Sequence, residues 1–269
     1  IADTCALYAN EIFDNYTTMN SMSLILGAVY FAFQIYGDFS GYSDIALGTS
    51  KLFGIDLLKN FDYPYFSRDI AEFWRRWHIS LSSWFRDYVY IPLGGSKGSK
   101  LFQLRNVMVI FLLSGFWHGA NWTFIVWGFL NAVYFIPLLL LNKNRNNMGE
   151  FRLSFNLNSL KIISNIAFTF AITCLAWIFF RANTIHQAVD YIYRIFTNHI
   201  FSFQYLHIGR SVEKLIVFLV IFSIIEWNNR NKIEPISGKY SWIKLALAIT
   251  AILTLGIFSD YKNFIYFQF

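Results

Sequence analysis

His118 lies at the centre of residues 113–122 (LSGFWHGANW), the segment whose residue types are best suited to chemistry. Residues 107–141 contain no lysine, arginine, aspartate or glutamate, so this imidazole is their only group that titrates near neutral pH. An ionisable side chain at membrane depth is costly and is by default a candidate functional group. A neutral imidazole can take a proton from a hydroxyl, so the segment predicts general-base chemistry at His118 or its transient acylation.

A second histidine, His78, lies in a segment rich in aromatic and basic residues. Over residues 70–88 the apolar side chains recur at steps of three and four, which predicts one interfacial helix with a broad aromatic face. Asp69 followed by Glu72 resembles an acidic capping box and places the start of that helix. His78 falls on the apolar face, where a lone histidine is ordinarily a packed core residue, so its structural and functional interpretations both stay open.

The apolar run around His118 is too long for one membrane crossing and too short for two. About 35 residues of helix would cover about 50 Å, more than one bilayer core of about 30 Å but less than two crossings with a turn. A broken or re-entrant hairpin resolves the mismatch, with Gly115, Gly119 and Asn121 as the residues that make the break. Asn121 is a candidate donor to a developing oxyanion, and capping of the following helix is the alternative.

The composition indicates a polytopic membrane protein. Of the 269 residues, 56% are hydrophobic, 20% aromatic and only 14% charged. Cys5 and Cys174 have no metal or redox spacing, so no disulfide framework or metal site is predicted. The net charge of +6 comes from cations beside apolar spans, where loop topology and lipid headgroups explain it without nucleic acid. The first residue is Ile1, and we expect a piece of a longer chain.

Several further elements follow from the pattern of apolar residues. Residues 22–36 form a short apolar run that ends in a polar cluster at 37–44, where Asp38 and Asp44 either cap a following helix or hold a cation or an acceptor hydroxyl. Residues 162–180, 215–227 and 242–258 are predicted spans. Basic loops on either side of the His118 hairpin should lie in the cytoplasm. His186, His199 and His207 have no metal-ligand spacing.

Two long motifs carry a family resemblance. Residues 72–95 (EFWRRWHISLSSWFRDYVYIPLGG) and 115–122 (GFWHGANW) resemble the membrane-bound O-acyltransferase (MBOAT) superfamily. Within it, the alginate and peptidoglycan O-acetyltransferase membrane subunits are the more similar branch, and residues 36–44 (YGDFSGYSD) and 177–182 (WIFFRA) fit the same group. Teichoic-acid D-alanyl transfer proteins are similar around the tryptophan-histidine helix.

The resemblance implies an all-α, polytopic transmembrane bundle with re-entrant and interfacial helices around a central chamber. Residues 1–269 would form one such domain, the C-terminal part of a longer chain. His118 matches the family's invariant histidine, and His78 matches a second polar position, so both are predicted to be catalytic. The predicted substrate-binding residues are Arg75, Arg76, Trp77, Trp117 and Asn121.

The expected activity is transfer of an acyl group, most simply acetyl, from a cytoplasmic thioester to hydroxyls of an extracytoplasmic polysaccharide such as alginate or peptidoglycan. Acetyl-coenzyme A or an acyl carrier would be the donor, and no permanently bound cofactor is expected. The expected location is the inner membrane, with a glycan-acetylating partner protein outside it. The alternatives are a D-alanyl exporter of the teichoic-acid type, a non-enzymatic transporter, and a scaffold for a separate transferase.

Overall fold

The computed structural model describes residues 1–151, 156–199, 212–231 and 240–255. In these residues the secondary structure is helical and contains no strand. The helices are α1 (Ala2–Asp14), α2 (Ser21–Leu52), α3 (Ile70–Arg76), α4 (Ile79–Phe85), α5 (Lys100–His118), α6 (Trp122–Leu140), α7 (Leu157–Arg181), α8 (Ile185–Thr197), α9 (Val212–Asn229) and α10 (Ser241–Leu255). Short helical turns cover Tyr16–Thr18, Pro64–Phe66 and Arg86–Tyr90.

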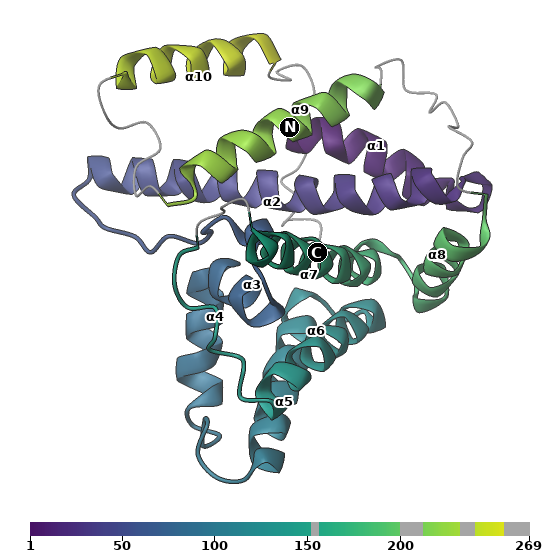
Figure 1. The fold of residues 1–269 in the computed structure, drawn as a ribbon, viewed down its shortest axis with the longest axis vertical. Helices are drawn as coiled ribbons and strands as arrows, with labels where there is room; N and C mark the ends of the chain where they lie inside the picture. The colour runs from purple at the N-terminus through teal and green to yellow at the C-terminus, as the bar shows by residue number, and fades with distance from the viewer. Residues whose placement is uncertain (152–155, 200–211, 232–239, 256–269) are drawn as a thin grey trace.

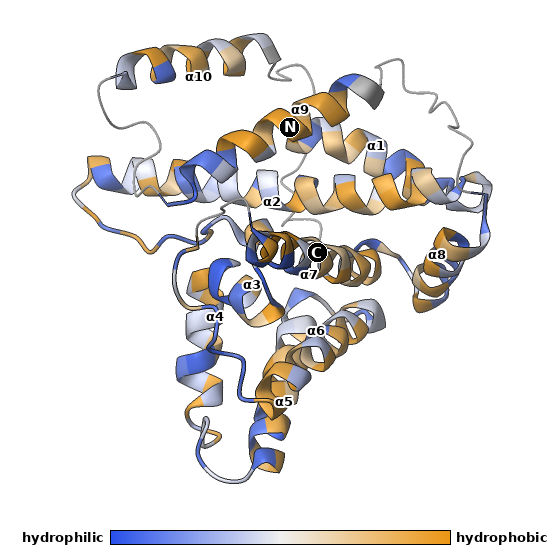
Figure 2. Cartoon of the chain, in the orientation of Figure 1, coloured by the Kyte–Doolittle hydropathy of each residue, from blue (hydrophilic) through white to orange (hydrophobic). Residues whose placement is uncertain are grey.

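Within the described part of the chain, four helices are long and apolar enough to cross a membrane, namely α2, α5, α6 and α7. The chain is therefore a multi-pass membrane protein with an all-α fold, as the sequence predicts. Figure 2 shows the apolar residues concentrated along α5, α6 and α7 and along one half of α2. The predicted span at 215–227 lies in α9, which carries Glu213, Lys214 and Glu226, and the span predicted at 242–258 overlaps the fifteen-residue α10.

The core lies where α1, α2, α7 and α8 meet. α1 packs along α2 (Figure 1), and α7 and α8 also contact α2. Tyr8, Phe13, Phe31 and Tyr191 are completely buried there, and the rings of Phe13 and Tyr191 stack with centroids 4.5 Å apart. Both cysteines are buried free thiols. This aromatic core fixes the N-terminal half of α2 and the C-terminal end of α7, and both also reach the site described below.

The polar cluster at residues 37–44 does not end a helix, contrary to the sequence prediction. α2 runs without interruption from Ser21 to Leu52, so Asp38 and Asp44 lie inside it and cap no new helix. Asn20 caps α2 instead, its side-chain oxygen accepting from the Ser23 amide over 2.8 Å. A glycine costs only about 1 kcal/mol inside a helix, and Gly37 packs against Ala2 at the start of α1.

The predicted helix over residues 70–88 is divided into two. α3 begins as expected, with the Asp69 carboxylate accepting from the Glu72 amide over 2.7 Å. At His78, however, the backbone is left-handed with a φ of 43°, and α4 starts at the next residue. The Ile79 amide donates to the Asn60 carbonyl over 2.9 Å, so a loop distant in sequence stabilises the break. The apolar periodicity continues through this break and could not reveal it.

α5 and α6 form the predicted broken hairpin, but as two helices of 19 residues each. α5 begins at Lys100, seven residues before the apolar run, so each helix is about 28 Å long and matches a bilayer core. Gly119 makes the break, with φ 152° and ψ 165°, a region open essentially to glycine. Gly115 has a different role from the one predicted, because it lies within α5 against the Phe124 carbonyl.

Two glycines let the backbones of α5 and α6 meet. A Cβ added at Gly115 would lie 2.3 Å from the Phe124 carbonyl oxygen, and one added at Gly128 would lie 2.2 Å from that of Phe111. Both distances are far below van der Waals contact. The atom in the way is a backbone carbonyl, which cannot rotate aside as a side chain can. The hairpin that carries His118 therefore depends on these two positions.

We expect Gly128→Ala to destabilise the protein by about 3 kcal/mol, because it overpacks a helix crossing. Gly41→Ala is the matched control, since Gly41 lies in α2 and a methyl group added there would have nothing within 4 Å. Alanine there should raise stability slightly through helix propensity. Thermal denaturation of the solubilised full-length protein measures both, and equal midpoints for the two variants would contradict the close crossing.

Candidate functional site

His78 and His118 line one cavity of about 430 Å³, although 40 residues separate them in the sequence. His78 reaches it from the break between α3 and α4, and His118 from the last residue of α5. The walls are mainly aromatic and are formed by Trp74, Trp77, Phe111, Trp127, Trp177 and Phe180. The cavity is thus a largely apolar chamber that is lined by two imidazoles.

Aromatic rings hold both imidazoles edge to face. The His118 ring lies 4.9 Å from that of Phe180 and 5.2 Å from that of Trp127, measured between centroids. The His78 ring lies 4.7 Å from Phe39 of α2. Trp117 contacts both histidines, with centroids 4.9 Å from His118 and 6.2 Å from His78. The imidazoles are therefore oriented by packing on rigid helices rather than by loops.

Local backbone geometry places His118 at the end of its helix. Gly119 ends α5, and the Asn121 side chain then caps α6 by accepting from the Thr123 amide over 3.1 Å. The Asn121 amide nitrogen donates to the Asn183 carbonyl over 3.2 Å, which ties the break to the end of α7. Of the two roles considered for Asn121, capping is the one seen.

Burial keeps His78 neutral. The loss of hydration lowers its pKa from 6.5 to about 4, because the apolar surroundings disfavour the imidazolium. At pH 7 the ring therefore offers one donor and one acceptor nitrogen. Such a group can accept or relay a proton within the chamber.

This shift predicts a pH dependence of stability. As the pH falls below 6.5, His78 becomes protonated in the unfolded state but stays neutral in the folded state down to about pH 4. The free energy of unfolding therefore decreases progressively over this range. At pH 5, about 1.5 units below the unfolded pKa, the free energy of unfolding is lower by about 2 kcal/mol, because each unit corresponds to about 1.4 kcal/mol. The difference in thermal midpoint between pH 7.5 and pH 5 should be smaller for His78→Gln than for the wild type. Parallel shifts in the two proteins would exclude a neutral buried His78.

The rim of the chamber is basic. Arg75, Arg86 and Arg145 line it, together with Asn144 of the loop between α6 and α7. The Arg75 guanidinium donates to the carbonyls of Asn144 and Asn147, and burial lowers its pKa. Arg86 is paired with Asp87 over 2.7 Å. Arg145 is exposed and has no ion pair with another described residue.

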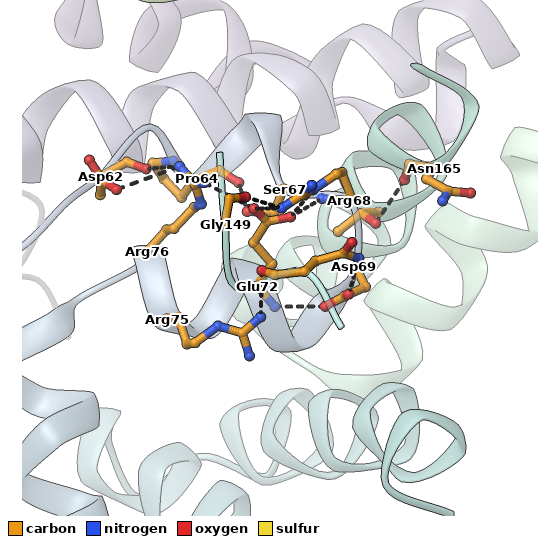
Figure 3. A network of polar contacts seen from close by, with 12 residues as sticks. Asp62, Pro64, Ser67, Arg68, Asp69, Glu72, Arg75, Arg76, Gly149 and Asn165 are labelled. Atoms are coloured by element: carbon orange, nitrogen blue, oxygen red, sulfur yellow. Dashed lines mark hydrogen bonds and ion pairs between the residues drawn. The ribbon is translucent and has the colours of Figure 1, made fainter. Parts of the chain in front are cut away.

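A buried ion-pair network supports α3 behind this rim (Figure 3). Glu72, 1% exposed, accepts from Arg68 and Arg76 over 2.9 Å each. Arg76 also approaches Asp62 and does not line the chamber. On the other side of α3, Asp69 accepts from the Asn147 amide. The network therefore fixes both the α3 segment that carries Arg75 and the loop that it contacts.

A second cavity, of about 440 Å³, adjoins the same histidine. His118 and Phe180 line both cavities. The second one is polar, and its other lining residues include Asn10, Gln34, Asn121, Arg181 and Asn183. The sequence could not predict this grouping, because its members come from α1, α2, the α5–α6 break and the end of α7.

The two cavities lie toward opposite ends of the helices. Ser96 and Asn144, which line the first, belong to the loops before α5 and after α6. Asn121 and Asn183, which line the second, belong to the segments after α5 and after α7. Since α5, α6 and α7 are candidate spans, His118 connects a space that approaches one membrane face with a space that approaches the other.

The comparison with protein families is decisive at this point. The model of the MBOAT, membrane-bound O-acyltransferase family, matches residues 10–181, which include α2 to α7 and both histidines. This chain belongs to the MBOAT family. The resemblance drawn from residues 72–95 and 115–122 is confirmed.

Three curated relatives refine the placement within the MBOAT family. The peptidoglycan O-acetyltransferase of Helicobacter pylori is 34% identical over 292 residues, which cover 100% of this chain and 54% of that protein. The probable alginate O-acetylase AlgI of Pseudomonas aeruginosa is 42% identical over 190 residues, covering 70% and 34%. The teichoic acid D-alanyltransferase of Streptococcus thermophilus is 39% identical over 139 residues, covering 46% and 34%. The chain thus spans about half of the first relative's length.

The predicted MBOAT site residues fall into three groups. His118, His78, Arg75 and Trp77 line the first chamber. Trp117 contacts both histidine rings but is half exposed, and Asn121 lines the second cavity. Arg76 is placed in the ion-pair network. The prediction missed Trp74 and Trp127, whose indole nitrogens are buried without a hydrogen-bond partner in the described residues, and their helical spacing gave no signal beyond core packing.

Proposed function

We propose that this chain supplies the transfer site of a membrane O-acyltransferase that moves an acyl group, most simply acetyl, from a thioester to a hydroxyl. One observation carries the proposal: His118 lines both an aromatic chamber with a basic rim and a polar cavity toward the other end of the helices. A donor and an acceptor can therefore approach one imidazole from opposite membrane faces.

The reaction follows from the chemistry of a neutral imidazole. A hydroxyl oxygen of the acceptor attacks the thioester carbonyl while His118 takes the hydroxyl proton. The tetrahedral intermediate collapses, the carbon–sulfur bond breaks, and the same proton passes to the leaving thiolate. His78, neutral and in the same chamber, positions the donor or relays the proton. The aromatic walls exclude water, which limits hydrolysis of the thioester.

The donor side of the proposal is supported by the basic rim. Acetyl-coenzyme A and the phosphopantetheine arm of an acyl carrier both combine a thioester with phosphate groups. Arg145, and Arg86 with its partner Asp87, are positioned to meet those phosphates, while Arg75 holds the rim loop. The basic loops also favour a cytoplasmic location for this rim. The protein would then lie in the inner membrane.

The acceptor side is supported by the names of the relatives. Peptidoglycan and alginate are polymers outside the inner membrane, so the proposed acceptor is a hydroxyl of an extracytoplasmic polysaccharide, reached directly or through a partner protein. The matched teichoic acid D-alanyltransferase supports D-alanyl transfer as the second candidate, because it is 39% identical to this chain over 139 residues.

Isotopic labelling tests the proposal. Membranes containing the full-length protein are given acetyl-coenzyme A labelled in the acetyl group or, in a parallel reaction, a carrier thioester of labelled D-alanine, and the label is located by mass spectrometry. Ester-linked acetyl on a polysaccharide supports the proposal, and ester-linked D-alanine supports the second candidate. Movement of intact substrate across vesicles without any new ester would indicate a transporter and reject both.

A further inference from the structure

One wall of the aromatic chamber carries a serine whose hydroxyl is not used by the fold. Ser114 lines the chamber and is only 6% exposed. In the part of the chain that the structure describes, no hydrogen bond joins its Oγ to another residue. Hydroxyls inside helices commonly bond the carbonyl four residues earlier, as Thr169 and Thr173 do in α7 over 2.8 Å. Because a buried hydroxyl normally has a partner, a molecule bound in the chamber can supply it.

Ser114 lies one helical turn before His118 on the same face of α5. The residues of α5 that line the chamber are Val107, Ile110, Phe111, Ser114 and His118, and they form one helical face. The Cβ atoms of residues four apart in a helix are about 5–6 Å from each other. The Cα–Cβ bonds of a helix are tilted toward its N-terminus, so the His118 side chain is directed back toward the turn that carries Ser114.

The order of these two side chains along α5 matches the direction of the proposed transfer. A donor that enters at the basic rim meets Ser114 before His118, whereas an acceptor reaches His118 from the polar cavity, which Ser114 does not line. The attacking oxygen must lie about 3 Å from the imidazole and about 3–3.5 Å from the thioester carbon. The thioester carbonyl then falls on the Ser114 side of the imidazole.

We infer that the Ser114 hydroxyl is a further catalytic group, which donates a hydrogen bond to the thioester carbonyl oxygen as negative charge develops on it. The inference rests on the proposed function and adds the group that stabilises the tetrahedral intermediate. His118 takes the proton of the acceptor hydroxyl, and Ser114 keeps its own proton throughout. In an apolar chamber little water competes for such a bond. Asn121, the oxyanion donor considered from the sequence, caps α6 and lines the polar cavity instead.

Ser114→Ala tests this role by separating kcat from KM. Initial rates of labelled ester formation are measured at varied acetyl-coenzyme A in membranes with equal amounts of each full-length protein. Ser114→Ala should lower kcat by about 10²- to 10³-fold, the usual effect of removing one oxyanion donor. KM should stay within about twofold, because the bond strengthens only in the transition state. Ser114→Cys should behave like alanine, since a thiol is a weak donor, and Ser114→Thr should recover about tenfold in kcat.

Ser83→Ala is the matched control. The Ser83 hydroxyl donates to the Ile79 carbonyl over 2.7 Å and lines neither cavity, so both kinetic constants should stay as in the wild type. A wild-type kcat for Ser114→Ala, or an effect on KM alone, would overturn the oxyanion role. So would no recovery in a Ser114→Thr protein that has the thermal midpoint of the wild type.

Two further measurements separate the remaining outcomes. Labelled acetyl bound covalently to Ser114 of the wild type, located by peptide mass spectrometry, would make the serine a nucleophile and overturn the inference. If the thermal midpoint shows that Ser114→Ala is unfolded, kcat of Ser114→Cys, which keeps a similar volume, decides. No ester from the wild type with either labelled thioester would reject the proposed function, whereas undiminished ester formation by Ser114→Ala rejects this inference alone.

Discussion

Replacing His118 with alanine is expected to lower acyl transfer by at least about 10²- to 10⁴-fold, the usual contribution of a positioned general base. The imidazole is the one titratable group that lines both cavities, and no side chain in the described chamber walls can take its place except His78, which lines only the first. Transfer is measured as labelled acetyl ester formed by membranes that contain equal amounts of each protein.

His186→Ala is the matched control for this experiment. His186 lies exposed on α8 and lines neither cavity, so its removal should leave the rate unchanged. Membrane insertion of His118→Ala should equal that of the wild type, because His118 is the last residue of α5 and its replacement by alanine leaves the apolar span intact. Wild-type levels of ester from His118→Ala would reject its catalytic role.

Glu72→Gln is expected to destabilise the protein by about 3–5 kcal/mol, because it removes the charge from a buried ion pair and keeps the volume. The carboxylate is 1% exposed and accepts from Arg68 and Arg76 (Figure 3). The substitution would leave the Arg68 guanidinium without its counter-ion and Arg76 with Asp62 alone, at 3.5 Å. The Arg68 amide also donates to Glu72 over 2.7 Å, so the start of α3 would be weakened as well. Thermal denaturation of the solubilised full-length protein measures the loss.

The pair of Asp190 and Arg194 in α8 provides the comparison. It has the same spacing of four residues and the same distance of 2.9 Å as the pair of Arg68 and Glu72, but its side chains are 25–29% exposed. Partly exposed pairs contribute about 1 kcal/mol or less, so Asp190→Asn should change the midpoint little. Similar decreases of the thermal midpoint in the two variants would show that burial does not determine how much Glu72 contributes to stability.

The sequence predicted the structure correctly where residues that are close in the sequence determine it. The capping pattern at Asp69 and Glu72 located the start of α3, and Gly119 with Asn121 located the break after His118. The lack of charges over residues 107–141 predicted the membrane hairpin correctly. These features depend on neighbours within a few residues, which is the range over which sequence patterns act.

Other features depend on contacts that no local pattern contains. His78 interrupts a continuous apolar periodicity because Asn60, in a distant loop, binds the Ile79 amide. The glycines of residues 37–44 look like a turn, yet α2 stays helical through them, with Gly37 against Ala2 of α1 and Phe39 against His78. The sequence predicted Arg76 to be a substrate-binding residue, whereas in the structure its guanidinium is paired with the Glu72 carboxylate. The polar cavity joins Asn10, Gln34 and Arg181 from three helices, so only the assembled fold reveals it.

The close backbone contact of α5 with α6 limits how this protein can move. Two helices that touch through Gly115 and Gly128 cannot slide past one another without a steric collision, so they behave as a rigid body. Any opening that admits a bulky donor must then come from α3, α4 or the loop held by Arg75. Amide exchange with deuterium would accordingly be fastest in those segments and slowest along the hairpin.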